Sequence, residues 1–147
     1  MATVAQVLNS KPDQTVFTIA ATASVFDAIK MMADKHIGAV VVTEGEEIVG
    51  IMTERDYARK VMLKGKSSKD TFVREIMTPS PISIGLHTTV DEAMRIITTN
   101  RIRHLPVVDR DRVVGILSIG DVVNWIIASQ DQAIEHLENY IAGGYPR

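Results

Sequence analysis

The chain carries the stretch "GIMTERD" at Gly50–Asp56 and, 65 positions later, the related stretch "GILSIGD" at Gly115–Asp121. Both copies read glycine, two apolar residues, a hydroxyl residue, two variable positions and an aspartate. A hydroxyl residue that follows an apolar run and precedes an acidic residue by three positions is typical of a junction between a strand and a helix. The doubled stretch therefore predicts that one supersecondary unit occurs twice in the chain.

The repeat extends on both sides of this stretch. Residues 17–61 align with residues 82–126 without a gap. The main identical pairs are Val25/Val90, Ala28/Ala93, Ile37/Ile102, Val42/Val107, Gly50/Gly115, Ile51/Ile116 and Asp56/Asp121. A duplicated unit is the simplest explanation of this self-similarity.

The residue pattern of each repeat predicts the order strand, helix, strand, strand, helix. The opening strand is "TVFTI" or "PISI", and the helix after it has a capping box and apolar residues at i, i+3, i+4 and i+7. Two apolar runs joined by a charged turn predict a buried hairpin, and "ERDYARKVMLKG" or "GDVVNWIIASQ" closes the unit as a helix. We therefore expect an α/β (α+β) fold in which two β-α-β-β-α repeats pack as an intramolecular pseudo-dimer.

Three segments follow from this division. They are residues 1–70, the first repeat with a lead-in helix near the N-terminus; residues 71–128, the second repeat; and residues 129–147, a helical tail. In the tail, Ile134, Leu137 and Ile141 share one stripe, and Gly143-Gly144 predicts the helix end. Such a stripe is expected to be buried against the body of the protein or against a dimer mate.

Composition excludes several classes of function. The 147 residues suit one compact domain, and a net charge of -2 gives no excess of Lys and Arg for binding nucleic acid. Cysteine is absent, which excludes disulfides, thiolate nucleophiles and cysteine-rich zinc sites. No apolar run or N-terminal pattern indicates a membrane span or a signal peptide. We expect a soluble, cytoplasmic protein with no nucleic-acid or membrane partner.

With these features the chain resembles a tandem pair of CBS (cystathionine-β-synthase) domains. The resemblance rests on the doubled stretch, on "NRIRHLPVVD" at Asn100–Asp109 and on "MTPSPISI" at Met77–Ile84, and it covers residues 4–128. It implies a stand-alone CBS pair whose units enclose two clefts for adenosine-containing ligands. AMP is the first candidate ligand, and NAD, ADP and ATP are further candidates. The resemblance also implies a homodimer.

The resemblance further implies which residues form the clefts. In similar proteins the aspartate of the doubled stretch holds the ribose hydroxyls, and the hydroxyl residue three positions earlier faces the phosphate. Carried onto this sequence, the first cleft contains Thr53, Arg55, Asp56, Ile102, Arg103, His104 and Pro106. The second cleft contains Thr15, Ile37, Gly38, Ala39, Ser118, Gly120 and Asp121. Which cleft is occupied does not follow.

The two aspartates have an ordinary interpretation as well, because Thr53 with Asp56 and Ser118 with Asp121 have the spacing of capping boxes. Capping and binding can coexist, since an ionised carboxylate also accepts the two O–H donors of a cis-diol. Three groups that can carry positive charge (Arg55, Arg103 and His104) favour a phosphorylated ligand in the first cleft. The matching positions of the second cleft are Gly120, Gly38 and Ala39, so we expect no charge there.

Two hypotheses of function remain open. The first is a non-enzymatic sensor that binds an adenine nucleotide and signals to an unidentified regulated protein through a shift between the repeats. The second is a constitutive dimerisation or scaffold module. A hydrolase or metal enzyme is disfavoured, because no serine or threonine has a base beside it and the histidines lack metal-ligand spacing. Those histidines are His36, His87, His104 and His136.

Overall fold

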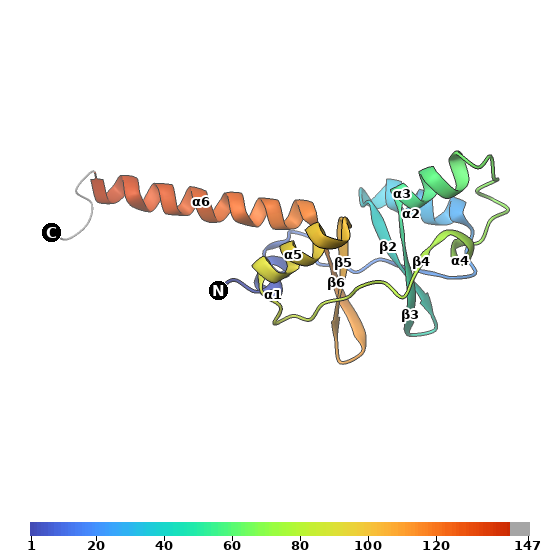
Figure 1. Ribbon diagram of the computed structural model, residues 1–147, viewed down its shortest axis with the longest axis horizontal. Coiled ribbons are helices and arrows are strands. Elements are labelled where there is room, and N and C mark those ends of the chain that lie inside the picture. The colour runs from blue at the N-terminus through green and yellow to red at the C-terminus, as the bar shows by residue number, and fades with distance from the viewer. Residues whose placement is uncertain (142–147) are drawn as a thin grey trace.

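The computed structural model describes residues 1–141 as two α+β units side by side, with a long C-terminal helix that projects from the second unit (Figure 1). The first unit contains β1 (Thr18–Ala20), α2 (Val25–Lys35), β2 (Ala39–Glu44), β3 (Glu47–Thr53), α3 (Glu54–Tyr57) and the π-helical turn η1 (Ala58–Met62). The second contains α5 (Val90–Asn100), β5 (His104–Asp109), β6 (Arg112–Ser118) and α6 (Ile119–Ile141). The remaining elements are α1 (Val4–Ser10), α4 (Val73–Ile76) and β4 (Thr78–Pro79).

The internal repeat is visible in the helix ends as well as in the order of elements. The Ser24 hydroxyl accepts a hydrogen bond from the backbone N–H of Asp27 at the start of α2, and Thr89 does the same at the start of α5. Both helices end at a residue in the left-handed conformation, His36 with φ 56° and Arg101 with φ 53°. The mixed α+β fold with two repeats, predicted from these local signals, is confirmed.

The two sheets differ in size. In the first unit β1 pairs parallel with β2, β2 and β3 form an antiparallel hairpin, and β4 adds to the free edge of β3. The second unit has only the β5–β6 hairpin, and its predicted opening strand "PISI" is reduced to a single bridge between Ile84 and Val107. The prediction of a full strand was wrong; Pro81, the first residue of this segment, has no N–H group to donate to a ladder.

Each unit has its own core, and each core includes a segment from beyond the chain-order division at residue 70. Val73 and Ile76 of α4 are buried in the core of the first unit. Val4 and Val7 of α1 are buried in the core of the second unit, and α1 lies beside α5 in Figure 1. The lead-in helix therefore packs on the second repeat, although it precedes the first repeat in the sequence.

The two glycines of the doubled stretch make room for these crossing segments. A Cβ atom on Gly50 would lie 2.5 Å from the Met77 sulfur and 2.9 Å from the Thr78 carbonyl oxygen. A Cβ atom on Gly115 would lie 2.9 Å from a methyl group of Leu8 in α1. Each β-hairpin is therefore crossed closely at its glycine by a segment from outside the repeat.

The closing helices differ between the units. The first is the four-residue α3 followed by η1, whereas α6 continues for 23 residues through the predicted tail. Ile134 and Leu137 are 54% and 57% exposed, so the expected burial of this stripe against the body is wrong for the single chain. Figure 1 shows α6 running away from the second unit, beyond α1 and α5. The predicted helix stop at Gly143-Gly144 and the side chain of Ile141 lie outside the described residues.

No helix within residues 1–141 combines the length and the apolar character that crossing a bilayer requires.

Candidate functional site

Two cavities lie where the units meet. The first, of about 550 Å³, lies around the N-terminal end of α3. The second, of about 410 Å³, lies around the N-terminal end of α6. Both contain residues from both repeats, so that each cavity is a cleft between the two halves of the chain. We refer to them as the first and second clefts.

The first cleft gathers six of its seven predicted residues. These are Thr53, Arg55, Asp56, Ile102, Arg103 and His104. Pro106 does not line it, because it is buried within β5 opposite Ile116, and its carbonyl oxygen accepts a hydrogen bond from the backbone N–H of Ile84. The prediction for Pro106 extended the site two residues too far along the strand, into the core.

The first cleft is more strongly cationic than the sequence indicated. Five Arg and Lys side chains line it, against the carboxylates of Glu54 and Asp56, which gives a formal charge of +3. Arg59, Lys60 and Arg101 also line the cleft and were not predicted from the sequence. Lys60 had a recognisable signal, since it follows Asp56 by four residues and a helical pair at that spacing faces the same side.

Asp56 is the N3 residue of the capping box that its spacing from Thr53 predicts. Its backbone N–H donates to the Thr53 hydroxyl at 3.1 Å, and its Oδ2 accepts from the Thr53 backbone N–H at 3.0 Å. Its Oδ1 accepts from Lys60 Nζ at 3.2 Å and from the Thr78 hydroxyl at 3.4 Å. Both carboxylate oxygens therefore have partners within the chain, although the side chain still reaches the cleft.

The second cleft also gathers six of its seven predicted residues. These are Thr15, Ile37, Gly38, Ala39, Ser118 and Asp121. Gly120 lies in the first turn of α6 and does not line the cleft. The expectation that this cleft lacks charge was wrong, because Lys11 and Lys35 line it together with Asp13 and Asp121. Lys11 lies after α1, outside the aligned repeats, so comparison of matching positions could not find it.

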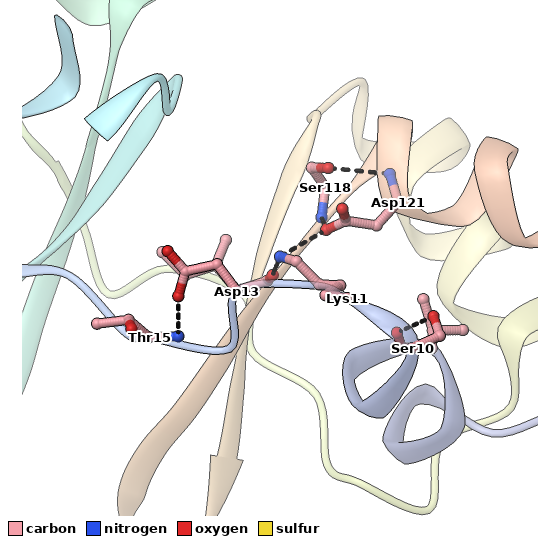
Figure 2. Close-up of polar contacts among 8 residues, drawn as sticks. Ser10, Lys11, Asp13, Thr15, Ser118 and Asp121 are labelled. Carbon is pink, nitrogen blue, oxygen red and sulfur yellow. Dashed lines mark hydrogen bonds and ion pairs between the residues drawn. The ribbon is translucent and has the colours of Figure 1, made fainter. Parts of the chain in front are cut away.

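Asp121 repeats the capping arrangement but has a different cation (Figure 2). Its backbone N–H donates to the Ser118 hydroxyl at 3.0 Å, and its Oδ2 accepts from the Ser118 backbone N–H at 2.9 Å. Lys11 Nζ donates to the same Oδ2 at 3.0 Å and to the carbonyl oxygen of Ile116 at 3.2 Å. Within residues 1–141 the Oδ1 of Asp121 has no hydrogen-bond partner, unlike the Oδ1 of Asp56.

Asp13 lies on the chain segment that follows Lys11 (Figure 2). Its Oδ1 accepts a hydrogen bond from the backbone N–H of Thr15 at 2.9 Å. Hydrogen bonding from the side chain of Thr15, and then from its backbone, holds the pKa of Asp13 below its ordinary value. The second cleft therefore balances two lysines with two carboxylates.

Gly38 and His104 line both clefts and so form the wall between them. A Cβ atom on Gly38 would lie 3.4 Å from Nε2 of His104, so the glycine lets the backbone approach the imidazole. Burial lowers the pKa of His104, and Asp121 and Glu54 oppose this by favouring the charged form. The imidazole is therefore predominantly neutral at pH 7.

Among the residues that the structure describes, no three histidine or acidic side chains gather in a way that could hold a metal ion.

Comparison with known proteins agrees with this architecture. A family model for the CBS domain matches residues 4–63 and residues 73–128. The mitochondrial CBS domain-containing protein CBSX3 of Arabidopsis thaliana is 42% identical over 127 residues, which are 83% of this chain and 62% of that protein. The chain thus spans less than two thirds of the length of this relative.

Solved structures are similar over a larger share of their length. A protein with CBS domains from Burkholderia ambifaria is 50% identical, with a TM-score of 0.85 over 88% of this chain and 96% of that one. The structure of CBSX2 in complex with AMP is 26% identical, with a TM-score of 0.73 over 88% of this chain and 99% of that one.

Proposed function

The chain belongs to the CBS domain family, with two CBS domains in tandem, and we propose that it is a regulatory module that binds an adenine nucleotide in the first cleft. AMP is the first candidate, since the similar CBSX2 structure contains AMP. NAD, ADP and ATP offer the same adenosine and phosphate groups. The module is a sensor rather than an enzyme, and a regulated protein, not identified by the chain itself, responds to its occupancy.

The charge of the first cleft is the observation that carries this proposal. Five Arg and Lys side chains from both repeats converge on one cavity of about 550 Å³. A phosphate monoester carries a charge of about -1.5 to -2 at pH 7 and forms strong hydrogen bonds with guanidinium groups. In this proposal, Arg55 from the first repeat and Arg103 from the second would hold the phosphate from both units.

Asp56 would then hold the ribose. Its two capping bonds with Thr53 are internal to the fold, whereas Lys60 and Thr78 are partners that a ligand can replace. The hydrogen bond from Thr78 is long, at 3.4 Å, and the Lys60 side chain is 44% exposed. A cis-diol that donates to Asp56 would release the Lys60 ammonium, which could then meet the phosphate of the same ligand.

Signalling requires that the ligand binds two arrangements of the chain with different affinity. Because each cleft takes residues from both repeats, a bound nucleotide favours the arrangement in which the two repeats close on it. A partner that binds one arrangement better is then coupled to the ligand, and the coupling acts equally in both directions.

Substitution of Arg103 tests the proposal. We expect Arg103→Ala to lower the affinity for AMP at least about tenfold and the affinity for adenosine much less, because only AMP offers a phosphate. Calorimetric titration of both ligands measures this. Arg112→Ala is the matched control, since Arg112 lies at the β5–β6 turn with its side chain 77% exposed and lines neither cleft.

Two results would contradict the proposal. Equal losses of affinity for AMP and adenosine would show that Arg103 shapes the cleft without meeting the phosphate. An unchanged affinity for AMP would show that the nucleotide does not bind in the first cleft.

A dimerisation or scaffold module is the second candidate, and exposed apolar side chains along α6 favour it. These include Val123, Ile127, Ile134 and Leu137. Thermal stabilisation by AMP separates the candidates, because a ligand at 100 times its Kd stabilises the folded protein by about 2.7 kcal/mol and a pure scaffold shows no shift. The cytoplasmic location expected from the sequence stays a prediction, and the relative CBSX3 is named as mitochondrial.

A further inference from the structure

One side chain is common to both clefts. Within residues 1–141, the linings of the two clefts share only Gly38 and His104, and glycine has no side chain. His104 is the first residue of β5, and its imidazole lies against the backbone of Gly38 from the opposite repeat. A ligand in either cleft therefore meets the same imidazole.

The imidazole of His104 is available for hydrogen bonding. It has no hydrogen-bond partner within the described chain. Since no buried side-chain nitrogen or oxygen atom there lacks a partner, the imidazole nitrogens are not buried. Its unpaired nitrogens are therefore open to the space of the clefts. A neutral imidazole donates from one nitrogen only, whereas a protonated imidazole donates from both.

Four charged groups from different elements act on the pKa of His104. Asp121 at the start of α6 and Glu54 at the start of α3 favour its protonated form. Arg103 beside it and Lys11 after α1 oppose protonation. More distant charged or titratable side chains also line the clefts: Lys35 and His36 in the second, and Arg55, Arg59, Lys60 and Arg101 in the first. Burial acts on top of these charges and lowers the pKa of His104.

We propose that His104 couples the two clefts: an anionic ligand in either cleft recruits a proton from solvent to the imidazole, which then donates a hydrogen bond to an anion in the other cleft. The inference rests on the proposed function of the first cleft and extends it, because it requires a second phosphorylated ligand in the second cleft. The protonated imidazole of His104 lines both clefts, so its positive charge makes binding of the second anion more favourable than binding of the first. By linkage the effect is the same whichever cleft fills first.

Proton uptake is the direct test. AMP is titrated into the full chain at pH 7 in two buffers with different ionisation enthalpies, which measures the protons bound per AMP. We expect uptake by the wild type and a smaller uptake by His104→Gln, whose amide does not titrate. The AMP phosphate itself titrates near pH 6, so the decisive quantity is the difference in proton uptake between the variants. His87→Gln should match the wild type, since His87 is exposed and lines neither cleft.

The coupling itself is measured in the same titrations. We expect two AMP molecules per chain and a coupling at pH 7 at least about threefold more favourable in the wild type than in His104→Gln. The difference should vanish at pH 8.5, where the imidazole stays neutral. Should His104→Gln fail to fold, the comparison of pH 7 with pH 8.5 in the wild type decides, because it uses no variant.

Several outcomes would overturn the inference. If AMP binds with the same proton uptake in the wild type and in His104→Gln, the coupling is ruled out but the proposed function is not. A single AMP per chain with no second event also removes the coupling. Absence of AMP binding by the wild type overturns the proposed function and the coupling together.

Discussion

Asp56 and Asp121 occupy matching positions in the two repeats and form the same capping box, yet their free oxygens differ. Oδ1 of Asp56 is held by Lys60 and Thr78, whereas Oδ1 of Asp121 has no partner within residues 1–141. Differences at single positions of the sequence explain this. The residue that matches Lys60 in the second repeat is Trp125, and the cation that contacts Asp121 is Lys11, which binds Oδ2. Helix capping thus uses one carboxylate oxygen and leaves the other for a cation or a ligand.

At the residue scale, His104 predicts how stability depends on pH. Burial lowers its pKa in the folded protein, so below the ordinary value of about 6.5 the unfolded chain binds the proton more readily. Stability is therefore retained above pH 6.5 and falls as the pH decreases below it. Urea unfolding at pH 7.5 and pH 5.5 should show a smaller loss for His104→Gln than for the wild type, and an equal loss would contradict the assignment. His87→Gln serves as the control.

At the element scale, one ion pair fixes α1 and the chain after it to the start of α6. Lys11 and Asp121 have side chains 30% and 18% exposed, and their atoms are 3.0 Å apart. Partial burial makes this pair stronger than a surface pair, so we expect Lys11→Met to lower the free energy of unfolding by about 1 kcal/mol. Urea unfolding measures this.

The matched control is Arg112→Met. Arg112 pairs with Glu46 at 3.9 Å, with side chains 77% and 90% exposed, so its loss should leave stability unchanged. Equal effects of the two substitutions would show that the contact of Lys11 adds nothing beyond surface charge.

The glycines of the doubled stretch give a second prediction at this scale. In Gly50→Ala the new methyl group would meet a backbone carbonyl of β4, which cannot move without breaking the β3–β4 pairing, so we expect a loss of about 1–3 kcal/mol. In Gly115→Ala it would meet only the end of the flexible Leu8 side chain, and the loss should be smaller. Gly85→Ala is the control, since its nearest contact would be 4.0 Å away. Urea unfolding ranks the three, and a greater loss for Gly115→Ala would contradict this explanation.

At the scale of the whole molecule, exposed apolar side chains predict a symmetric homodimer. Met62 and Leu63 at the end of the first closing helix, and Ile127, Ile134 and Leu137 on α6, are at least half exposed. Such surface is typical of an interface between copies of one chain. Light scattering at tens of micromolar should show a dimer, and a monomer with or without AMP would contradict the prediction.

Truncation after Gln130 locates the interface. Because α6 projects away from both units (Figure 1) and its distal side chains Ile134 and Leu137 are exposed, its truncation should weaken dimerisation and leave the fold of the two units unchanged. A truncated protein that sediments like the full chain would place the dimer contact elsewhere, on the segment around Met62. Circular dichroism and urea unfolding of the truncated protein provide the control for its fold.

Features that depend on neighbours along the chain could be predicted from the amino-acid sequence. Two repeats, the caps at Ser24 and Thr89, the hairpins and the capping boxes at Asp56 and Asp121 all follow from spacings of a few residues. Periodicity and capping arise from local backbone geometry, so a linear pattern is sufficient to predict them. The assignment of Arg55, Arg103 and His104 to one cleft came from the resemblance to the CBS family and not from these local patterns.

The structure was needed to show which distant segments meet. It placed α1 on the second core and β4 on the first sheet, brought Lys11 to Asp121 across 110 positions, and buried Pro106 away from the cleft. It also placed His104 in both clefts. These contacts depend on how two folded units bury their remaining apolar faces against each other and against the connecting segments, and no local pattern specifies that packing.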